Sequence, residues 1–417
     1  MEPIAVKETT KSHQIMSDTS DIGVDVSSDT LDDKHILVAI SGGIAVVDSV
    51  RLLRELRRHG AKITVVMTHS AQEIISPLAI EWASQSEVIT DWDSDMAQLD
   101  LVDAVLVCPA TRHTIGCHIH GILDTPMQMA LTAARSRKLP MLFIPSMHNS
   151  LSEDIVTEDL CGELENFGHQ VFWGEEQEGR RKQPDAVQII GLLSHIINQN
   201  LSNRRRVALT LGATRSAIDS VRWVQNTSSG KTGFDIADYL YRMGHDVIIM
   251  KGVVTADSPL NHTDIRDCKD PESMLSQLLD ISQSDNPPDA WIFSAAVLDY
   301  TVVNPIIEKI KSGKENFSIE LQKSEKHIDI ISKSCKDDLK IGFKLESGCT
   351  QPELIDSAQN SLKNNGLDAV IANHLESVKD GSIRAFWVDA KGTIIDLDDN
   401  LSMAKVIEKK LSEASND

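Results

Sequence analysis

Short apolar runs alternate with longer amphipathic stretches along most of the chain. The run ILVAIS at 36–41 is followed by a Gly-Gly turn and by a stretch at 46–60 whose apolar residues recur at helical spacing. A second apolar run, KITVVMT at 62–68, comes next. This order predicts a strand, a helix and a strand. Such a unit implies a parallel sheet, because the helix returns the chain to the edge from which it started.

The same alternation continues to the end of the chain. Apolar runs at 103–110 and 139–146 end in proline-containing loops, and after a polar, basic region at 175–206 the pattern restarts with RVALTLGATR at 206–215. The pattern therefore predicts an α/β protein with two doubly wound, Rossmann-like domains that hold ligands at the carboxyl ends of their strands. Near the end, the alternating run at 382–399 turns at Lys-Gly, which predicts a hairpin.

The first 33 residues lack this pattern. They hold few large apolar residues and many Ser, Thr and Asp. Such a segment cannot bury enough surface to offset its ordering entropy, so we predict a disordered acidic tail at 1–33. We place a first domain at 34–190, a linker at 191–205 and a second domain at 206–417.

Composition and charge exclude several classes of protein. The 417 residues are 41% hydrophobic and 25% charged, which is typical of a soluble protein with more than one core. A net charge of -21 disfavours general affinity for nucleic acid or anionic membranes, and no run of apolar residues is long enough to span a membrane. The six cysteines form no C-x-x-C pair, which favours a reducing, cytoplasmic location.

The loop NTSSGKTG at 226–233 has the composition of a phosphate-binding loop. Its GKT would supply a close-approach backbone, a cation and a hydroxyl, but the first glycine of a P-loop would fall at Gln225, so that interpretation fails. A Ser/Gly-rich turn that opens a helix can still bind phosphate through backbone N–H groups. Simple helix capping by Ser228 or Ser229 fits the loop alone equally well.

Further motifs favour the phosphate-binding interpretation. The segments LGATR, NTSSGKTG, SAAVLDY, KIKSGK, IGFKLES and VIANH follow one another between 206 and about 412. Together they resemble the phosphopantothenate–cysteine ligase family. The resemblance implies that the carboxylate of 4'-phosphopantothenate attacks CTP to give an acyl-cytidylate, which the amine of cysteine then resolves. Mg²⁺ would neutralise the triphosphate.

The resemblance also implies roles for individual residues. Asn226 would donate to the acyl-cytidylate, and Lys309 would contact the nucleotide and the metal. Two lysines common in the family are replaced here by Ser361 and Asn365, and we expect Lys363, between them, to reach the triphosphate. ATP in place of CTP stays open. The remaining residues implied to bind substrate or nucleotide are Ser228, Ser229, Gly230, Asp299, Lys311 and Phe343.

The first half carries a second resemblance. Its segments ISGGIA, VVMTHSAQEIISP, CPATRHTIGCHIHGILD and IPSMHN resemble the flavoproteins that decarboxylate phosphopantothenoylcysteine. The resemblance implies FMN as the electron sink and a substrate carboxylate held by Met147 with His148 or Asn149, His148 being the implied catalytic residue. The residues implied to bind FMN are Ser41, Gly42, Gly43, Ile44, Thr68, Ser70, Pro109, Ala110 and Thr111.

Two departures from the family bear on the decarboxylase activity. The catalytic histidine expected before the P-A-T segment has no counterpart, and Gln98 or Asp95 stands nearest. The flap that carries a proton-donating cysteine is replaced by EEQEGRRK at 175–182. Our leading hypothesis is a bifunctional enzyme of coenzyme A biosynthesis. The alternative is a ligase whose impaired FMN-binding domain serves as an oligomerisation platform.

The last expectations concern metals and partners. His113, His118 and His120, with Cys117, offer ligand types suited to a metal. We nevertheless predict no metal site there, because the segment offers no carboxylate partner. The resemblance implies small-molecule substrates, neither nucleic acid nor membrane as partner, and a homo-oligomer with trimeric contacts between flavoprotein domains and dimeric contacts between ligase domains.

Overall fold

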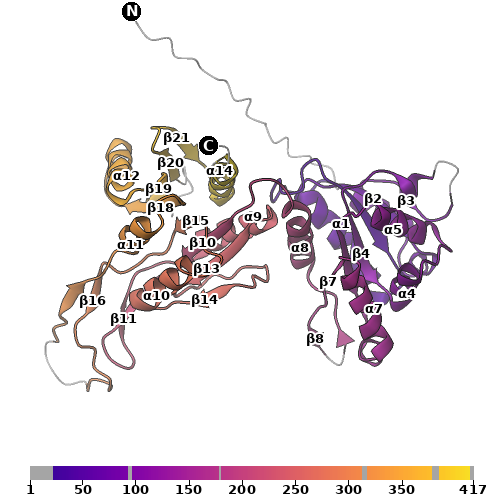
Figure 1. The fold of residues 1–417 in the computed structure, drawn as a ribbon, viewed down its shortest axis with the longest axis horizontal. Coiled ribbons are helices and arrows are strands. Elements are labelled where there is room, and N and C mark those ends of the chain that lie inside the picture. The colour runs from indigo at the N-terminus through magenta and orange to yellow at the C-terminus, as the bar shows by residue number, and fades with distance from the viewer. Residues whose placement is uncertain (1–21, 93–95, 178–179, 312–316, 378–384, 414–417) are drawn as a thin grey trace, which may run out of the picture.

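A computed structural model describes residues 22–92, 96–177, 180–311, 317–377 and 385–413. Two parallel sheets, each flanked by helices on both faces, form the two halves of the molecule (Figure 1). The predicted pair of doubly wound, Rossmann-like domains is thus confirmed. In the first sheet the strand order is β3-β2-β1-β4-β5-β7 and every neighbouring pair is parallel. Its strands are β1 (His35–Ile40), β2 (Lys62–Met67), β3 (Val88–Ile89), β4 (Ala104–Ala110), β5 (Met141–Pro145) and β7 (Gln170–Val171).

Alternate residues of each strand enter opposite cores of the first half. Ile36 and Val38 of β1 pack with α1, α3 and α8, whereas Leu37 and Ala39 pack with α4, α5 and α7 on the other face. Because both faces are covered, the central strands are predominantly apolar. The helices are η1 (Ile44–Asp48), α1 (Ser49–Arg58), α2 (His69–Gln72), α3 (Pro77–Ser84), η2 (Ala97–Leu99), α4 (Arg112–His120), α5 (Pro126–Ser136), α6 (Asn149–Ser152), α7 (Ile155–Asn166) and α8 (Ala186–Asn198).

The second sheet has the order β14-β13-β10-β15-β18-β19-β20-β21. Its first six strands are parallel, and the predicted hairpin, β20 and β21, completes it in antiparallel pairing. Its strands are β10 (Arg206–Leu211), β13 (Asp246–Lys251), β14 (Ile265–Asp267), β15 (Ala290–Phe293), β18 (Leu339–Glu346), β19 (Ala369–His374), β20 (Ala385–Asp389) and β21 (Ile394–Leu397). Its helices are α9 (Lys231–Arg242), α10 (Pro271–Ser282), α11 (His327–Ser334), α12 (Gln351–Asn365) and α14 (Asn400–Glu413).

Two small structures project from the sheets. In the first half, β6 (Met147–His148), β9 (Arg180–Arg181) and β8 (Glu176–Gln177) form an antiparallel sheet. In the second half, the ribbons β11 (Arg215–Ala217) with β12 (Trp223–Gln225), and β16 (Tyr300–Val302) with β17 (Leu321–Lys323), extend away from the main sheet (Figure 1). We call residues 215–225 and 300–323, as far as they are described, the arm.

The end of the predicted tail is packed rather than disordered. Leu31 is 0% exposed, and the backbone N–H of Ser27 donates to the Arg58 carbonyl at 2.8 Å. Asp29 accepts a hydrogen bond of 2.9 Å from the Tyr239 hydroxyl and pairs with Lys405 at 2.9 Å. The prediction of disorder is therefore wrong for residues 22–33. It overlooked that polar side chains can be ordered by partners far away in the sequence.

The predicted linker is also shorter than expected. Residues 191–198 belong to α8, whose apolar residues Ile189, Leu193 and Ile197 are buried in the core of the first half. Asn198, at its end, donates to the carbonyls of Thr30 at 2.9 Å and Arg242 at 2.8 Å. The helix therefore joins the N-terminal segment to both halves, and only the residues that follow it act as a connection.

Candidate functional sites

The Ser-Gly-Gly turn lies at the carboxyl end of β1, beside the ends of β2 and β4. The Ser41 hydroxyl donates to the Pro109 carbonyl at 2.7 Å and accepts from the Thr111 N–H at 2.9 Å, and the residue is 1% exposed. Pro109 and Ala110 are buried within β4. Ser41, Pro109 and Ala110 thus have little exposed surface in this structure, and their contact with FMN stays a prediction. The two hydrogen bonds of Ser41 tie the Ser-Gly-Gly turn to the end of β4.

The accessible predicted FMN-binding residues do meet at this edge of the sheet. Thr68 and Ser70 share a hydroxyl contact of 3.3 Å, and Thr111 caps α4. A Cβ on Gly42 would lie 2.3 Å from the Ser70 Oγ and 2.8 Å from its carbonyl carbon, so only glycine fits there. This backbone cradle suits a phosphate, which needs close approach to N–H groups. Ile44, at the rim, is largely exposed and can contact an apolar ring.

The predicted carboxylate-binding residues lie beside the small antiparallel sheet. Met147 and His148 form β6, which pairs with β9 from the segment that replaces the family's cysteine flap. His148 is exposed, and its Nδ1 lies 3.1 Å from the Ser150 hydroxyl. Asn149 donates to Glu176 at 2.7 Å, while its Oδ1 is buried without a hydrogen-bond partner. The described residues of this segment thus contact Met147, His148 and Asn149 through β9 and Glu176.

Of the two residues that stand nearest to the missing histidine, Gln98 cannot serve as a substitute. Gln98 is 3% exposed, and its Nε2 contacts the sulfurs of Met96 and Met129. It therefore packs into the protein and cannot transfer a proton. Asp95 lies outside the described residues.

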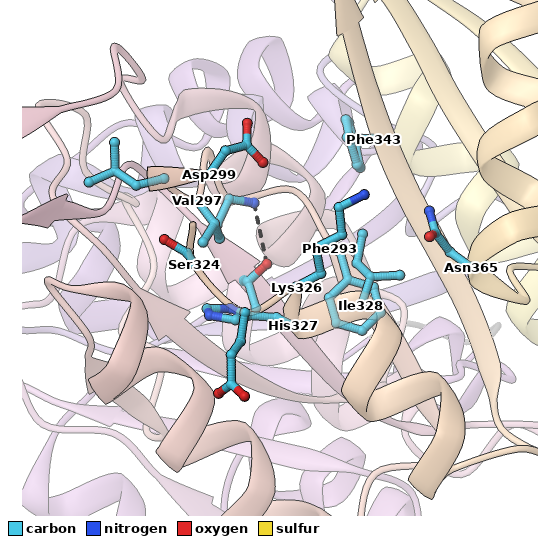
Figure 2. Close-up of a pocket in the computed structure, with 13 residues that line it drawn as sticks. Phe293, Val297, Asp299, Ser324, Lys326, His327, Ile328, Phe343 and Asn365 are labelled. Carbon is cyan, nitrogen blue, oxygen red and sulfur yellow. Dashed lines mark hydrogen bonds between the residues drawn. The ribbon is translucent and has the colours of Figure 1, made fainter. Parts of the chain in front are cut away.

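A cavity of about 230 Å³ opens at the carboxyl ends of β10, β15 and β18 in the second half. Asp299 and Phe343, both predicted, lie at its wall together with Ser324, Lys326 and Asn365 (Figure 2). Apolar side chains such as Phe293 and Ile328 line it as well. An apolar wall with a few polar groups is the usual character of a small-molecule site.

The predicted phosphate turn adjoins this cavity. Asn226 donates its amide to the carbonyls of Ala296 at 3.3 Å and Val297 at 3.0 Å, which leaves Oδ1 as its acceptor. Gly230, at φ +80°, is the N-cap of α9 and contributes no side-chain hydrogen bond. Ser229 Oγ accepts only from the Lys231 N–H, at 3.3 Å among the described contacts. Asn226 thus ties the start of the turn to the segment after β15, the Ser229 carbonyl accepts from the Thr255 and Ala256 N–H groups, and α9 has no side-chain cap.

Three predicted lysines do not reach the cavity of their own chain. Lys309 and Lys311 are exposed on the arm, which the Asp219 carboxylate holds through the Ile310 N–H at 3.1 Å. Lys363 lies on another face of α12, in a groove beside the turn at Gly392. Lys363 therefore lies away from the cavity that Asn365 lines, which disfavours the expectation that it reaches a triphosphate bound there.

Lys326 is the lysine at the cavity wall, and sequence reasoning missed it. It precedes α11 as the N-cap, so its ammonium group and the positive end of the helix lie on the same side of the cavity. Next to it, His327 is buried, and burial lowers its pKa to about 4, so the ring is neutral. The sequence signal that could have identified Lys326 is its position directly before a helix, shortly after the motif KIKSGK.

The predicted set of histidines separates into two groups. His118 is buried with its Nε2 3.3 Å from the Nε2 of His169. Burial, and then the charge of Arg135, lower the pKa of His118 to about 3 and that of His169 to about 4. His113 and Cys117 form the second group, together with Asp124. The ring nitrogen, the sulfur and the carboxylate oxygen of these residues lie within 4.8 Å of one another. The argument that the segment lacks a carboxylate partner is therefore wrong.

Comparison with known proteins covers both halves. Residues 25–198 match the family described as flavoprotein, and residues 202–413 match the family described as DNA/pantothenate metabolism flavoprotein C-terminal domain. The coenzyme A biosynthesis bifunctional protein CoaBC of Thermococcus kodakarensis is 32% identical over 352 residues, which cover 82% of this chain and 86% of that protein. The chain belongs to the CoaBC family.

A second CoaBC relative agrees with this assignment, and a solved structure is similar to half of this chain. The CoaBC protein of Methanocaldococcus jannaschii is 28% identical over 355 residues, covering 84% of this chain and 85% of that protein. A crystal structure of the DNA/pantothenate metabolism flavoprotein from Streptococcus pneumoniae, 27% identical, covers 50% of this chain and 98% of its own, with a TM-score of 0.45. In the described part of this CoaBC chain, no helix is long and apolar enough to cross a membrane.

Proposed function

We propose that this CoaBC protein ligates cysteine to 4'-phosphopantothenate with CTP and then decarboxylates the product to 4'-phosphopantetheine. The observation that carries the proposal is the pair of sites at the carboxyl ends of the two sheets, one in each matched family region. Each site combines a glycine turn with polar groups from neighbouring strands. That arrangement suits phosphorylated ligands in doubly wound sheets.

In the ligase reaction, a substrate carboxylate oxygen attacks the α-phosphate of CTP and pyrophosphate leaves. The amine of cysteine then attacks the acyl carbon, and CMP leaves. The cavity supplies Lys326 for the triphosphate and Phe343 for the base, and the turn at Ser228 to Gly230 supplies N–H groups for a phosphate. Mg²⁺ would bind chiefly through the triphosphate, with Asp299 at the cavity wall as its protein carboxylate.

In the decarboxylase reaction, FMN when bound would accept electrons from the cysteinyl thiol and return them after CO₂ is lost. The chain's own residues hold the reactants. Gly42 and Gly43 would approach the FMN phosphate, and Thr68, Ser70 and Thr111 would donate hydroxyl hydrogen bonds. Asn149 is fixed beside His148 by its hydrogen bond to Glu176 and would offer its second amide N–H to the expected substrate carboxylate.

A second candidate function is a ligase whose flavoprotein half binds FMN without decarboxylating. The burial of Gln98 favours it, because no titratable side chain from that described segment takes the place of the missing histidine. The two functions differ in one measurement. With phosphopantothenoylcysteine as substrate, CO₂ release above that of FMN-free protein supports the bifunctional enzyme, and release at the FMN-free rate supports the ligase alone.

A dimer through the ligase half would account for Lys309 and Lys311. The arm that carries them is unusually apolar on its surface, and Ile307 is 91% exposed. Such a surface favours contact with a second protein surface, and a dimer would carry one chain's arm toward its partner. The exposed apolar residues of the arm are Val221, Trp223, Tyr300, Ile306, Ile307, Phe317, Ile319 and Leu321.

The decisive experiment for the ligase combines the purified protein with 4'-phosphopantothenate, cysteine, CTP and Mg²⁺. We expect stoichiometric pyrophosphate, CMP and phosphopantothenoylcysteine. The same mixture with ATP measures the choice of nucleotide. No pyrophosphate with either nucleotide would refute the ligase function.

A further inference from the structure

His113, Cys117 and Asp124 form a compact group that neither proposed reaction uses as a unit. His113 and Cys117 lie one turn apart on α4, and the His113 Nε2 is 3.5 Å from the Cys117 Sγ. The Asp124 carboxylate comes from the loop after the helix. The ligand atoms of all three residues lie within 4.8 Å of one another.

The backbone around Asp124 brings this group together. Gly121 ends α4 with φ +68°, in the left-handed region that reverses the chain. The Ile122 N–H then donates to the Cys117 carbonyl at 2.9 Å, which folds the loop back over the last turn of the helix. Directly after Asp124, Thr125 caps α5 through the Gln128 N–H. Asp124 is therefore held between two helix ends and faces Cys117.

The spacing agrees with tetrahedral coordination by a metal ion. Zinc–sulfur bonds of about 2.3 Å and zinc–nitrogen bonds of about 2.0–2.1 Å place two tetrahedral ligands about 3.5 Å apart. The observed separation of Nε2 and Sγ is 3.5 Å. The carboxylate needs to close by at most about 1.4 Å to reach bonding range. Asp124 is exposed, so its side chain is free to rotate.

The surroundings also suit a cation with one open position. Cys117 is buried, whereas His113 and Asp124 are exposed. His113 and Cys117 line an open groove together with Leu151 and Leu160. Arg112 lines the same groove, but its guanidinium is paired with Asp154 at 2.5 Å, which partly offsets its charge. Three protein ligands beside an open groove resemble zinc sites that keep a fourth position for an exchangeable ligand.

We propose that His113, Cys117 and Asp124 bind a Zn²⁺ ion, with the fourth coordination position open to the groove. The softness of these ligands favours Zn²⁺ over Mg²⁺, because a thiolate and an imidazole are poor ligands for Mg²⁺. The site is separate from the Mg²⁺ expected with the nucleotide, which lies in the other half of the chain. The zinc proposal rests on His113, Cys117 and Asp124 and does not depend on either proposed reaction.

The test uses Co²⁺ as a spectroscopic probe for Zn²⁺ on the full chain, freed of metals and kept anaerobic without thiols. We expect one Co²⁺ per chain, a thiolate-to-cobalt charge-transfer band and d–d bands of tetrahedral intensity, all abolished by added Zn²⁺. Cys117→Ser should lose the charge-transfer band. Asp124→Asn should weaken Co²⁺ binding by roughly tenfold or more, as expected when one of three ligands is weakened.

Two control variants separate this group from other ligands. His120→Ala removes an exposed histidine of the same helix, and Cys349→Ser removes a thiol that lies 3.8 Å from the Nδ1 of His374. Both should keep the band and the affinity. Circular dichroism and ligase turnover verify that each variant is folded. Absence of the band in the wild-type chain, or its survival in a folded Cys117→Ser variant, would overturn the proposal.

Discussion

Gly42→Ala is the sharpest test of the flavin cradle. The new methyl carbon would lie 2.3 Å from the Ser70 Oγ, 2.6 Å from its Cβ and 2.8 Å from its carbonyl carbon. The hydroxyl can rotate away, but the backbone carbon cannot. Carbon atoms prefer separations of about 3.5–4.0 Å, so the backbone at Ser70 must retreat by about 1 Å. That movement would also pull on Thr68, whose hydroxyl contacts Ser70.

The expected cost follows from this overlap. Overpacking of this kind costs about 1–3 kcal/mol. If the relaxed protein loses that amount of FMN binding energy, the affinity falls about 5- to 150-fold. Gly43→Ala is the matched control, because its methyl carbon would lie 3.6 Å from Thr111 Cγ2 and 3.9 Å from the Ser146 carbonyl, which are ordinary contacts.

The assay is a titration of metal-free and flavin-free protein with FMN, followed by the quenching of flavin fluorescence. Ligase turnover of the same samples reports on folding of the other half. We expect Gly42→Ala to bind FMN far more weakly than Gly43→Ala. Equal and undiminished affinity of the two variants would refute the close approach of the backbone to the flavin phosphate.

The remaining predictions concern the ligase cavity and the buried histidines. Lys326→Ala should raise the KM for CTP roughly 10- to 100-fold, the loss of one charged hydrogen bond, whereas Lys363→Ala should leave steady-state kinetics unchanged; equal effects would contradict our placement. Asn226→Asp should release pyrophosphate but slow the cysteine step by about 10²-fold, and unchanged full turnover in a coupled assay would refute its role. Because the lowered pKa values keep His118 and His169 neutral when folded, the unfolded chain gains protons first below about pH 6.5, and stability falls from there toward about pH 4. His118→Asn should reduce that slope in urea unfolding by up to about 1.4 kcal/mol per pH unit; an unchanged slope would argue against the pair.

The regular parts of the fold were predictable because their periodicity reflects burial on both faces of parallel sheets. The run at 36–41 had to be a buried strand, and the Gly-Gly turn after it marked a ligand edge. Ser41 shows where such reasoning stops. Its position in a motif is visible in the sequence, but the use of its hydroxyl within the protein depends on Pro109 and Thr111, which arrive from another strand.

The other differences between the sequence predictions and the structure arise from contacts between residues that are far apart in the sequence or on different faces of a helix. Asp124 joins Cys117 only because Gly121 reverses the chain, and the phase of α12 turns Lys363 away from the cavity while Asn365 faces it. Leu31 is buried in an otherwise polar segment, which average composition cannot reveal. In each case the missing information was a direction in space rather than a residue type.

The bridge formed by Asp29 limits how this protein can be cut into working pieces. A ligase fragment beginning at the connection after α8 would leave the Tyr239 hydroxyl and the Lys405 ammonium without their shared carboxylate, and the Arg242 carbonyl without Asn198. A flavoprotein fragment would leave Asp29 without Tyr239 and Lys405. The two halves therefore share polar contacts through the N-terminal segment, and we expect either half alone to be less stable than in the full chain.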